Sequence, residues 1–209
     1  GTNIALITDA GTPGISDPGE DLVRICYEQG IEVTSLPGAA ACITALTLSG
    51  LPTRRFSFEA FLPKEKKERA AVLEELKNDT RTLIVYEAPH HLLGTLKELQ
   101  NALGDRRLTV CRELTKKFET AFQTTFSEAI RYYEEQGVRG ECVLVIEGRS
   151  REELVQEAQQ SWEAISVEEH MEHYLSTGMD RKSAMKQVAK DRGVGKREIY
   201  QMLLKAENE

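Results

Sequence analysis

Residues 1–148 alternate short apolar runs with amphipathic segments, and this alternation is the strongest constraint on the fold. Short apolar runs bounded by glycine or proline are typical of buried strands, while apolar residues that recur every three or four positions indicate helices. The pattern predicts strands at Ile4–Thr8, Ile31–Leu36, Phe56–Phe61, Thr82–Tyr86, Leu108–Glu113, Phe118–Thr125 and Cys142–Glu147. It predicts helices at Glu20–Gln29, Ala39–Ser49, Lys64–Asn78, His90–Leu103 and Ser127–Gln136, with Ser127 as an N-cap. Such alternation favours an α/β domain with a mixed sheet flanked by helices.

The last 60 residues carry no strand pattern. Helices are expected at Glu152–Trp162, Ser166–Leu175, Lys182–Arg192 and Lys196–Lys205. We therefore predict two domains, 1–149 and 150–209, with 1–50 and 51–149 as subdomains of the first. Between residues 183 and 200 the order is helix, glycine-containing turn, helix, which is typical of a helix-turn-helix.

Charge is distributed unevenly along the chain. The whole sequence has a net charge of −7, yet residues 181–205 hold eight basic and two acidic residues, a local balance of +6. Two readings remain open for this basic tail: a pair of solvated helices, or a surface that contacts nucleic-acid phosphates.

Composition otherwise indicates an ordinary globular protein of the cytoplasm. No apolar run approaches 18 residues and no signal-peptide pattern is visible, so no membrane segment is expected. Cys26, Cys42, Cys111 and Cys142 lie far apart in apolar contexts, which favours buried free thiols in a reducing compartment. His170 and His173 could share a helix face, but a pair without further ligands is more often at the surface than in a metal site, so no metal is expected.

A polar loop follows the first apolar run. Residues 9–19 contain three glycines and two prolines, and they match neither the phosphate-loop motif nor the dinucleotide motif. Glycine permits close approach of a ligand to the backbone, and open α/β sheets bind ligands at the carboxyl ends of their strands. The loop is either such a ligand site or a structural crossover.

Several segments together resemble one family. They are Thr8–Gly19, Leu36-Pro37-Gly38-Ala39-Ala40-Ala41, Phe61-Leu62-Pro63-Lys64, Tyr86-Glu87-Ala88-Pro89-His90, Arg112–Glu119 and Gly140–Gly148. Their order is similar to that of the tetrapyrrole-methylase-fold superfamily of S-adenosylmethionine enzymes. Within it they resemble the bacterial enzymes that methylate the 2′-hydroxyl of a decoding-region cytidine in small-subunit ribosomal RNA. Members of that group carry a further segment ahead of this point, so the resemblance implies that the first subdomain is incomplete here.

The resemblance also implies a cofactor site and a homodimer. The residues expected to bind S-adenosylmethionine are Asp9, Ala10, Gly11, Thr12, Ile15, Ala40, Ala41, Tyr86, Glu87, Glu141 and Cys142. Threonine at position 12 stands where the superfamily commonly has aspartate. The small side chains of Ala40 and Ala41 would admit the cofactor, although close helix packing explains them equally well.

On the substrate side, the segment Arg112–Glu119 is too charged to be core. Lys116 could lower the proton affinity of a ribose hydroxyl or hold a phosphate, and Glu113 could orient Lys116 or accept a proton. An ion-paired solvated loop is the alternative. The residues expected to contact RNA are Arg112, Lys117, Lys186, Lys190, Lys196 and Arg197. The charges at Lys64, Lys66, Lys67 and Arg69 form either a second RNA-contacting edge or a plain helix face.

Three functions compete on this evidence. The first is 2′-O-methylation of small-subunit ribosomal RNA, which the basic tail and the Arg112–Glu119 segment favour. The second is C-methylation of a corrin or porphyrin on the same fold. The third is a DNA-binding regulator that combines the helix-turn-helix with an α/β sensor domain.

Overall fold

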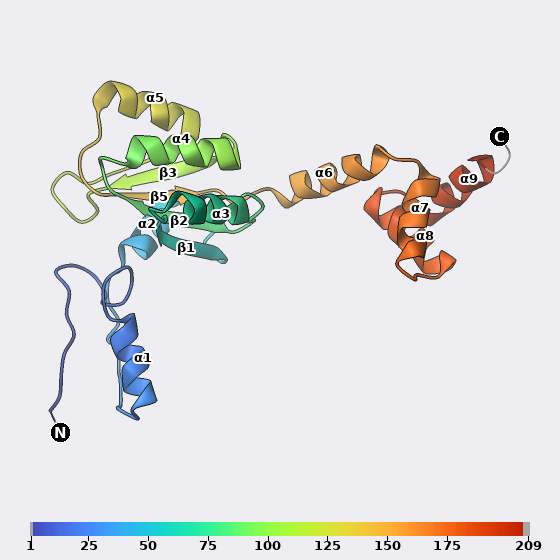
Figure 1. Ribbon diagram of the computed structural model, residues 1–209. Helices are drawn as coiled ribbons and strands as arrows, with labels where there is room; N and C mark the ends of the chain where they lie inside the picture. Colours follow the sequence, from blue (N-terminus) through green and yellow to red (C-terminus); the bar gives the residue numbers. More distant parts are fainter. Residues whose placement is uncertain (1, 207–209) are drawn as a thin grey trace. The chain divides into compact units, whose positions relative to one another are not determined.

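The computed structural model describes residues 2–206 (Figure 1). The chain divides into two compact units, with the boundary after Arg149. The first unit contains a five-stranded sheet in the order β1-β2-β5-β3-β4. Its strands are β1 (Phe56–Phe61), β2 (Thr82–Glu87), β3 (Arg107–Arg112), β4 (Thr120–Thr125) and β5 (Cys142–Ile146). The β1–β2 pair is parallel and the other pairs are antiparallel, so the predicted mixed α/β sheet is confirmed.

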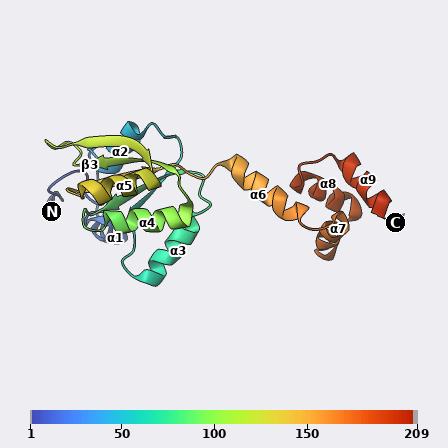
Figure 2. The ribbon, with the colours of Figure 1, turned by 90° about the horizontal axis from the view of Figure 1, so that it is seen from above.

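Helices cover both faces of this sheet (Figures 1 and 2). One face packs against α3 (Lys66–Leu76), α4 (Leu92–Leu103) and α5 (Phe126–Gln136), and residues such as Leu96 and Phe126 are fully buried there. The opposite face packs against α2 (Ala41–Ser49), whose apolar residues meet those of β2, β3 and β5. Alternation along each strand supplies both cores, because successive side chains point to opposite faces.

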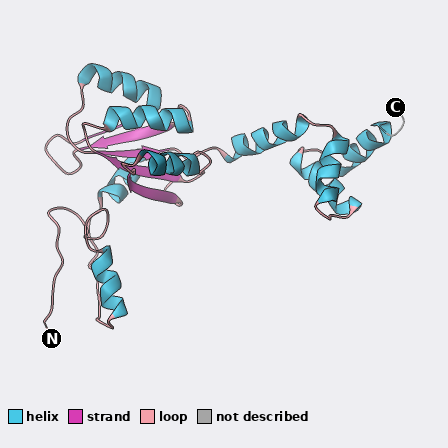
Figure 3. Ribbon diagram, in the orientation of Figure 1, coloured by secondary structure: helices cyan, strands magenta, loops and turns pink. Residues whose placement is uncertain are grey.

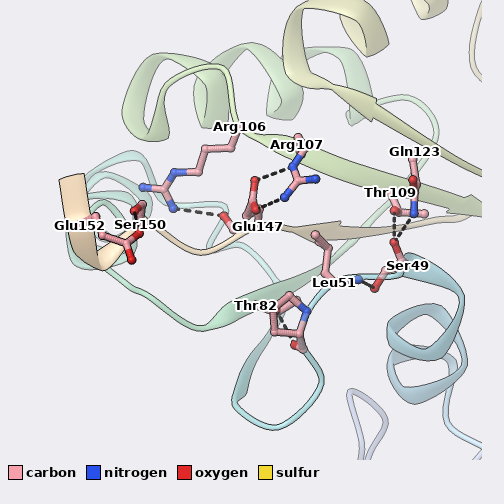
Figure 4. A network of polar contacts seen from close by, with 11 residues as sticks. Ser49, Leu51, Thr82, Arg106, Arg107, Thr109, Gln123, Glu147, Ser150 and Glu152 are labelled. Carbon is pink, nitrogen blue, oxygen red and sulfur yellow. Dashed lines mark hydrogen bonds and ion pairs between the residues drawn. The ribbon is translucent and has the colours of Figure 1, made fainter. Parts of the chain in front are cut away.

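A set of polar contacts fixes the end of α2 to the sheet (Figure 4). The Ser49 carbonyl accepts hydrogen bonds from Thr109 Oγ1 at 3.1 Å and from Gln123 Nε2 at 2.8 Å. Gly50 ends the helix at φ +69°, and a Cβ there would lie 2.7 Å from Gln123 Nε2. These bonds fix the carboxyl end of α2. Its amino end, at Ala41, lies beside the carboxyl ends of the parallel strands β1 and β2.

Two predicted strands are wrong. Ile4–Thr8 and Ile31–Leu36 are loops (Figure 3), and their large side chains are mostly exposed, with Ile4 at 86% and Leu36 at 82%. Apolar composition alone does not make a strand, because the backbone needs a neighbouring strand to complete its hydrogen bonds; within residues 2–206 neither segment has one. The helix between them, α1 (Glu20–Glu28), forms as predicted but buries none of its residues.

The start of α5 also differs from its prediction. Thr125, not Ser127, is the N-cap, and it forms a capping box with Glu128. Ser127 instead binds the loop before β3: its backbone N–H and its hydroxyl each lie 2.7 Å from a carboxylate oxygen of Asp105. Sequence alone could not separate two hydroxyl residues so close together, since each suits an N-cap.

The second unit is helical. It contains α6 (Arg151–Glu163), α7 (Val167–Ser176), α8 (Arg181–Asp191) and α9 (Lys196–Ala206). Its core gathers Met171, Ala184, Val188, Ile199 and Leu203 from the last three helices. No helix within residues 2–206 is long and apolar enough to cross a membrane. The four cysteines are free thiols; three are buried, whereas Cys26 is only partly so.

His170 is buried, which contradicts its expected place at the surface. Its side chain is 0% exposed and its ring stacks on Trp162 with centroids 3.8 Å apart. Its Nδ1 accepts a hydrogen bond from Arg192 Nε at 3.1 Å, and its Nε2 lies 3.5 Å from Asp191 Oδ2. Burial lowers the pKa of His170 below the ordinary value of 6.5, and the nearby Arg192 cation lowers it further.

We predict that the helical unit loses stability as the pH falls below about 6.5. The unfolded chain then binds a proton at position 170 that the folded unit binds only at lower pH, so the free energy of unfolding decreases on acidification. Trp162 is the only tryptophan and contacts His170, so its fluorescence in thermal melts reports this unit. His170→Phe should flatten the pH dependence, while His173→Gln, which changes an exposed histidine, should keep it. Equal pH profiles for wild type and His170→Phe would contradict this.

Candidate functional site

The ends of four strands surround one cavity in the first unit. The carboxyl ends of β1, β2 and β3 and the amino end of the antiparallel β5 lie at the same sheet edge. The cavity has a volume of about 330 Å³, and the loop 9–17 and the start of α2 complete its walls. This is the position at which open α/β sheets bind ligands.

The structure brings every predicted cofactor residue and both predicted catalytic residues to this cavity. The lining residues are Asp9, Ala10, Gly11, Thr12, Ile15, Ser16, Asp17, Ala39, Ala40, Ala41, Thr44, Phe61, Tyr86, Glu87, Cys111, Glu113, Leu114, Thr115, Lys116, Glu141, Cys142 and Val143. Sequence reasoning did not single out Ser16, Asp17, Ala39, Thr44, Phe61, Cys111, Leu114, Thr115 and Val143. Apolar side chains such as Phe61, Leu114 and Val143 give no chemical signal of their own. The predicted RNA contacts are not part of the lining.

Two segments of the predicted cofactor site, which lie far apart in the sequence, are joined by a hydrogen bond. Thr12 Oγ1 donates a hydrogen bond to the Ala39 carbonyl at 2.9 Å. Gly38 permits this approach, because a Cβ there would lie 2.9 Å from Thr12 Oγ1. Gly11 has φ +81°, a conformation that favours glycine, and a Cβ there would lie 3.4 Å from the Ala39 carbonyl. The walls are therefore backbone and small side chains, a surface suited to close contact with a ligand.

Lys116 also lines the cavity, and its ammonium lies within 4 Å of two carboxylates. Its Nζ lies 3.2 Å from Glu113 Oε1 and 3.7 Å from Glu141 Oε2. The hydrogen bond to Glu113 raises the pKa of Lys116, and the same bond lowers the pKa of Glu113. Lys116 is therefore a cation at neutral pH and Glu113 a carboxylate, so neither group is a strong base.

The backbone around this pair is held in an unusual shape. Glu113 and Thr115 adopt φ values of +51° and +63°, which are uncommon for residues other than glycine. The Glu113 N–H donates to the Glu141 carbonyl at 3.1 Å, and the Glu141 N–H donates back to Glu113 Oε1 at 3.1 Å. A Cβ on Gly140 would lie 2.5 Å from Glu113 Cγ, so a larger residue would displace this carboxylate. Such strained conformations cluster at functional sites.

Two predicted RNA contacts near this loop differ in their surroundings. The Arg112 guanidinium donates hydrogen bonds to Thr120 Oγ1 and to the Arg139 carbonyl, both at 3.2 Å, and so stabilises the loop that follows β3. Lys117 is exposed, with its Nζ 5.6 Å from the Phe118 ring centroid. Of these two residues, Lys117 is therefore the one that presents its charge to solvent.

Two thiols and one phenol in the cavity lining are neutral at neutral pH. Burial raises the pKa of the Cys111 thiol to about 11 and that of Cys142 to about 12, so neither is a thiolate nucleophile at neutral pH. Burial also raises the pKa of Tyr86 to about 12. The Tyr86 hydroxyl accepts a hydrogen bond from the Cys42 N–H at 2.8 Å, which leaves its own proton to donate. Within residues 2–206 no group of three side chains is arranged to hold a metal ion.

Comparison with known proteins identifies the family and the fold. The family model for tetrapyrrole (corrin/porphyrin) methylases matches residues 1–130. The chain belongs to this family. Tetrapyrrole methylases are S-adenosylmethionine-dependent, and the predicted fold class, cofactor and enzyme class are confirmed. The solved methyltransferase CobJ shares the fold, with a TM-score of 0.50 and 20% identity over 65% of this chain and 61% of its own.

Closer relatives have a more specific name. The protein called ribosomal RNA small subunit methyltransferase I from Halalkalibacterium halodurans is 48% identical over 96% of this chain and 68% of its own length. The protein of that name from Bacillus subtilis is 48% identical over the same shares. That of Synechocystis sp. is 44% identical over 99% of this chain and 73% of its own.

The cavity suits the family cofactor. Backbone at Gly11 and Ala39 can lie against its amino-acid and ribose parts, and the Tyr86 proton is available as a donor. We therefore predict that Gly11→Val weakens binding of S-adenosylhomocysteine at least about tenfold. Valine at positive φ costs about 1–2 kcal/mol, and its methyl groups would enter the cavity.

The matched control is Gly30→Val, measured alongside by calorimetry. Gly30 has φ +66° with no other atom within 4 Å of its added Cβ, so that variant carries the same backbone strain away from the cavity. Equal affinity losses in the two variants would mean that strain in the segment, and not contact with the ligand, explains the effect.

Proposed function

We propose that this chain transfers the methyl group of S-adenosylmethionine to the 2′-hydroxyl of a cytidine in the decoding region of small-subunit ribosomal RNA. The 48% identity to two proteins called ribosomal RNA small subunit methyltransferase I carries the proposal. The cavity supports it, because the cofactor loop and the Lys116–Glu113 pair share one space. A hydroxyl held between them would meet a methyl donor on one side and a cation on the other.

The chemistry needs little beyond position and charge. The cofactor supplies an activated methyl group, so the chain must orient the acceptor oxygen in line with it and stabilise that oxygen as its proton leaves. The Lys116 ammonium lowers the pKa of a hydroxyl bound beside it. Glu113, whose own pKa is lowered, positions this ammonium through the 3.2 Å contact and is a poor proton acceptor.

The basic tail is proposed to hold the RNA. Lys186 and Lys190 lie on α8, Lys196 and Arg197 lie on α9, and all four are exposed. Arg192 belongs to the same basic segment, but its guanidinium donates hydrogen bonds within the unit, to the Ile165 carbonyl at 2.7 Å and to His170. The four exposed charges, together with Lys117, suit contacts with phosphates. Arg69, at the other candidate RNA edge, is paired with Glu98 at 2.5 Å and is a weaker candidate.

We also propose that the enzyme acts in the cytoplasm, where its substrate would be, and that it is a homodimer. Exposed apolar side chains on α1, such as Leu22 at 46% and Ile25 at 46%, are available for burial against a second copy. Sedimentation at micromolar concentration should give a dimer mass, and a monomer there would contradict this part of the proposal.

The experiment that tests the function offers the chain two acceptors. Purified protein is mixed with S-adenosylmethionine labelled in the methyl group, and with either undermethylated 30S subunits or a tetrapyrrole precursor. Label in the ribose of ribosomal RNA is the expected result. Label in the tetrapyrrole would overturn the proposal in favour of C-methylation, and label in neither, with binding to DNA, would favour a regulator.

A further inference from the structure

One strand at the cavity contains an irregularity that changes which way a side chain points. In the β1–β2 ladder Phe58 pairs with Ile84, Ala60 with Val85 and Phe61 with Tyr86, so Glu59 is an extra residue without a partner. This is a β-bulge, and Ala60 within it has φ +50°. A bulge of this kind re-aims the side chains that follow it, and bulges are common beside active sites.

The consequence for Phe61 follows from the alternation of side chains. In a regular strand Phe58 and Phe61, three positions apart, would point to opposite faces. Here Phe61 pairs with Tyr86, and Phe58 pairs with Ile84, two residues earlier on the same face of β2. Both phenylalanine rings contact Tyr86 edge to face, with centroids 4.9 Å away for Phe58 and 5.7 Å away for Phe61. Without the bulge, in a regular ladder that pairs Glu59 as well, Phe61 would face the core beneath α3 to α5.

The two phenylalanines have different surroundings. Phe58 packs with the core cluster under α2, whereas Phe61 lines the cavity and is 52% exposed. A strained alanine therefore places a second aromatic ring beside Tyr86 in the lining of the cavity. An aliphatic side chain at position 61 would also line the cavity, but it would offer no flat face to a planar ligand.

We propose that Phe61 is the stacking surface for a nucleobase in this cavity. The inference rests on the proposed function, which offers two sources of such a base: the adenine of the cofactor, and a nucleotide of the RNA. Stacking of a base on an aromatic ring suits either source, because every base has a π-face. The bulge at Glu59 and Ala60 turns the Phe61 ring toward the cavity.

Binding measurements on the purified chain test this without activity. Affinities for S-adenosylhomocysteine, by calorimetry, and for 30S subunits, by filter binding, are measured for wild type, Phe61→Ala, Phe61→Leu and Phe61→Trp. Tyr132→Ala, which removes a 50% exposed aromatic residue on α5 outside the cavity lining, is the control. Phe61→Ala and Phe61→Leu should each weaken one ligand by about 5- to 150-fold, the contribution of one stacked base, and Phe61→Trp should restore it.

The ligand that weakens identifies the base. Loss for S-adenosylhomocysteine alone assigns the ring to the adenine, and loss for the 30S subunit alone assigns it to the RNA; both results support the proposal. Wild-type affinity for both ligands in Phe61→Ala, or full affinity in Phe61→Leu, would overturn it while leaving the proposed function intact. Failure of the wild-type chain to bind either ligand would instead overturn the proposed function, and this inference with it.

Discussion

Lys116→Ala is expected to lower the turnover number about 10²- to 10³-fold while leaving the affinity for S-adenosylhomocysteine within about twofold of wild type. Loss of a group that stabilises charge developing on the reacting oxygen typically costs this much. The Lys116 ammonium lies 3.2 Å from Glu113 and lines the cavity, so it can reach a bound hydroxyl. An interaction used chiefly as the hydroxyl reacts should appear in kcat and not in ground-state binding of the methyl donor.

The neighbouring lysine provides the control. Lys117 has the same side chain in the same loop but does not line the cavity. Lys117→Ala should therefore leave kcat near the wild-type value and change, at most, the apparent affinity for the ribosomal subunit. Single-turnover rates on undermethylated 30S subunits separate the two variants. Equal rates for Lys116→Ala and wild type would mean that Lys116 belongs to an ion-paired surface loop, as the sequence alone also permits.

Much of the fold could be predicted because the sheet is built from local patterns. β1 was predicted at its observed bounds, Phe56–Phe61, and the other four strands within about two residues. The two wrong predictions, Ile4–Thr8 and Ile31–Leu36, are apolar runs like those of the observed strands. A strand also requires a neighbouring strand, and composition cannot show whether one is present. The bulge at Glu59 was invisible for a related reason, since it exists only in the register between two strands.

Residues around the cavity could be predicted where the residue type itself points to ligand binding or catalysis. Glycines, charged residues and the loops after strands marked the walls, because ends of strands that run the same way meet at one edge. Packing decided the rest. The bulge, which only strand pairing shows, turns Phe61 to the cavity. His170, expected at the surface, is covered by the ring of Trp162. Roles for these residues in binding and catalysis remain predictions that the variants above test.

Replacing Lys186, Lys190, Lys196 and Arg197 together with glutamine is expected to weaken binding to 30S subunits about 10²- to 10³-fold at physiological salt. Each phosphate contact contributes about 0.7 to 0.9 to the slope of log affinity against log salt, so four lost contacts should flatten that slope by about 3. These side chains are exposed on α8 and α9, and none of them forms an ion pair within residues 2–206, so their charge is available to RNA. Affinity for S-adenosylhomocysteine should stay unchanged, because none of the four replaced residues lines the cavity.

The matched control replaces Lys77 and Lys97, which a carboxylate already neutralises. Their Nζ atoms lie 3.6 Å from Glu74 and 2.6 Å from Glu134, so their loss should leave the salt slope as it is. Titrations of labelled 30S subunits across a range of salt concentrations give both slopes. If the fourfold variant and wild type share one affinity and one slope, the helical unit does not hold the RNA backbone. Its basic residues would then be a solvated surface, and the likeness to a helix-turn-helix would concern packing alone.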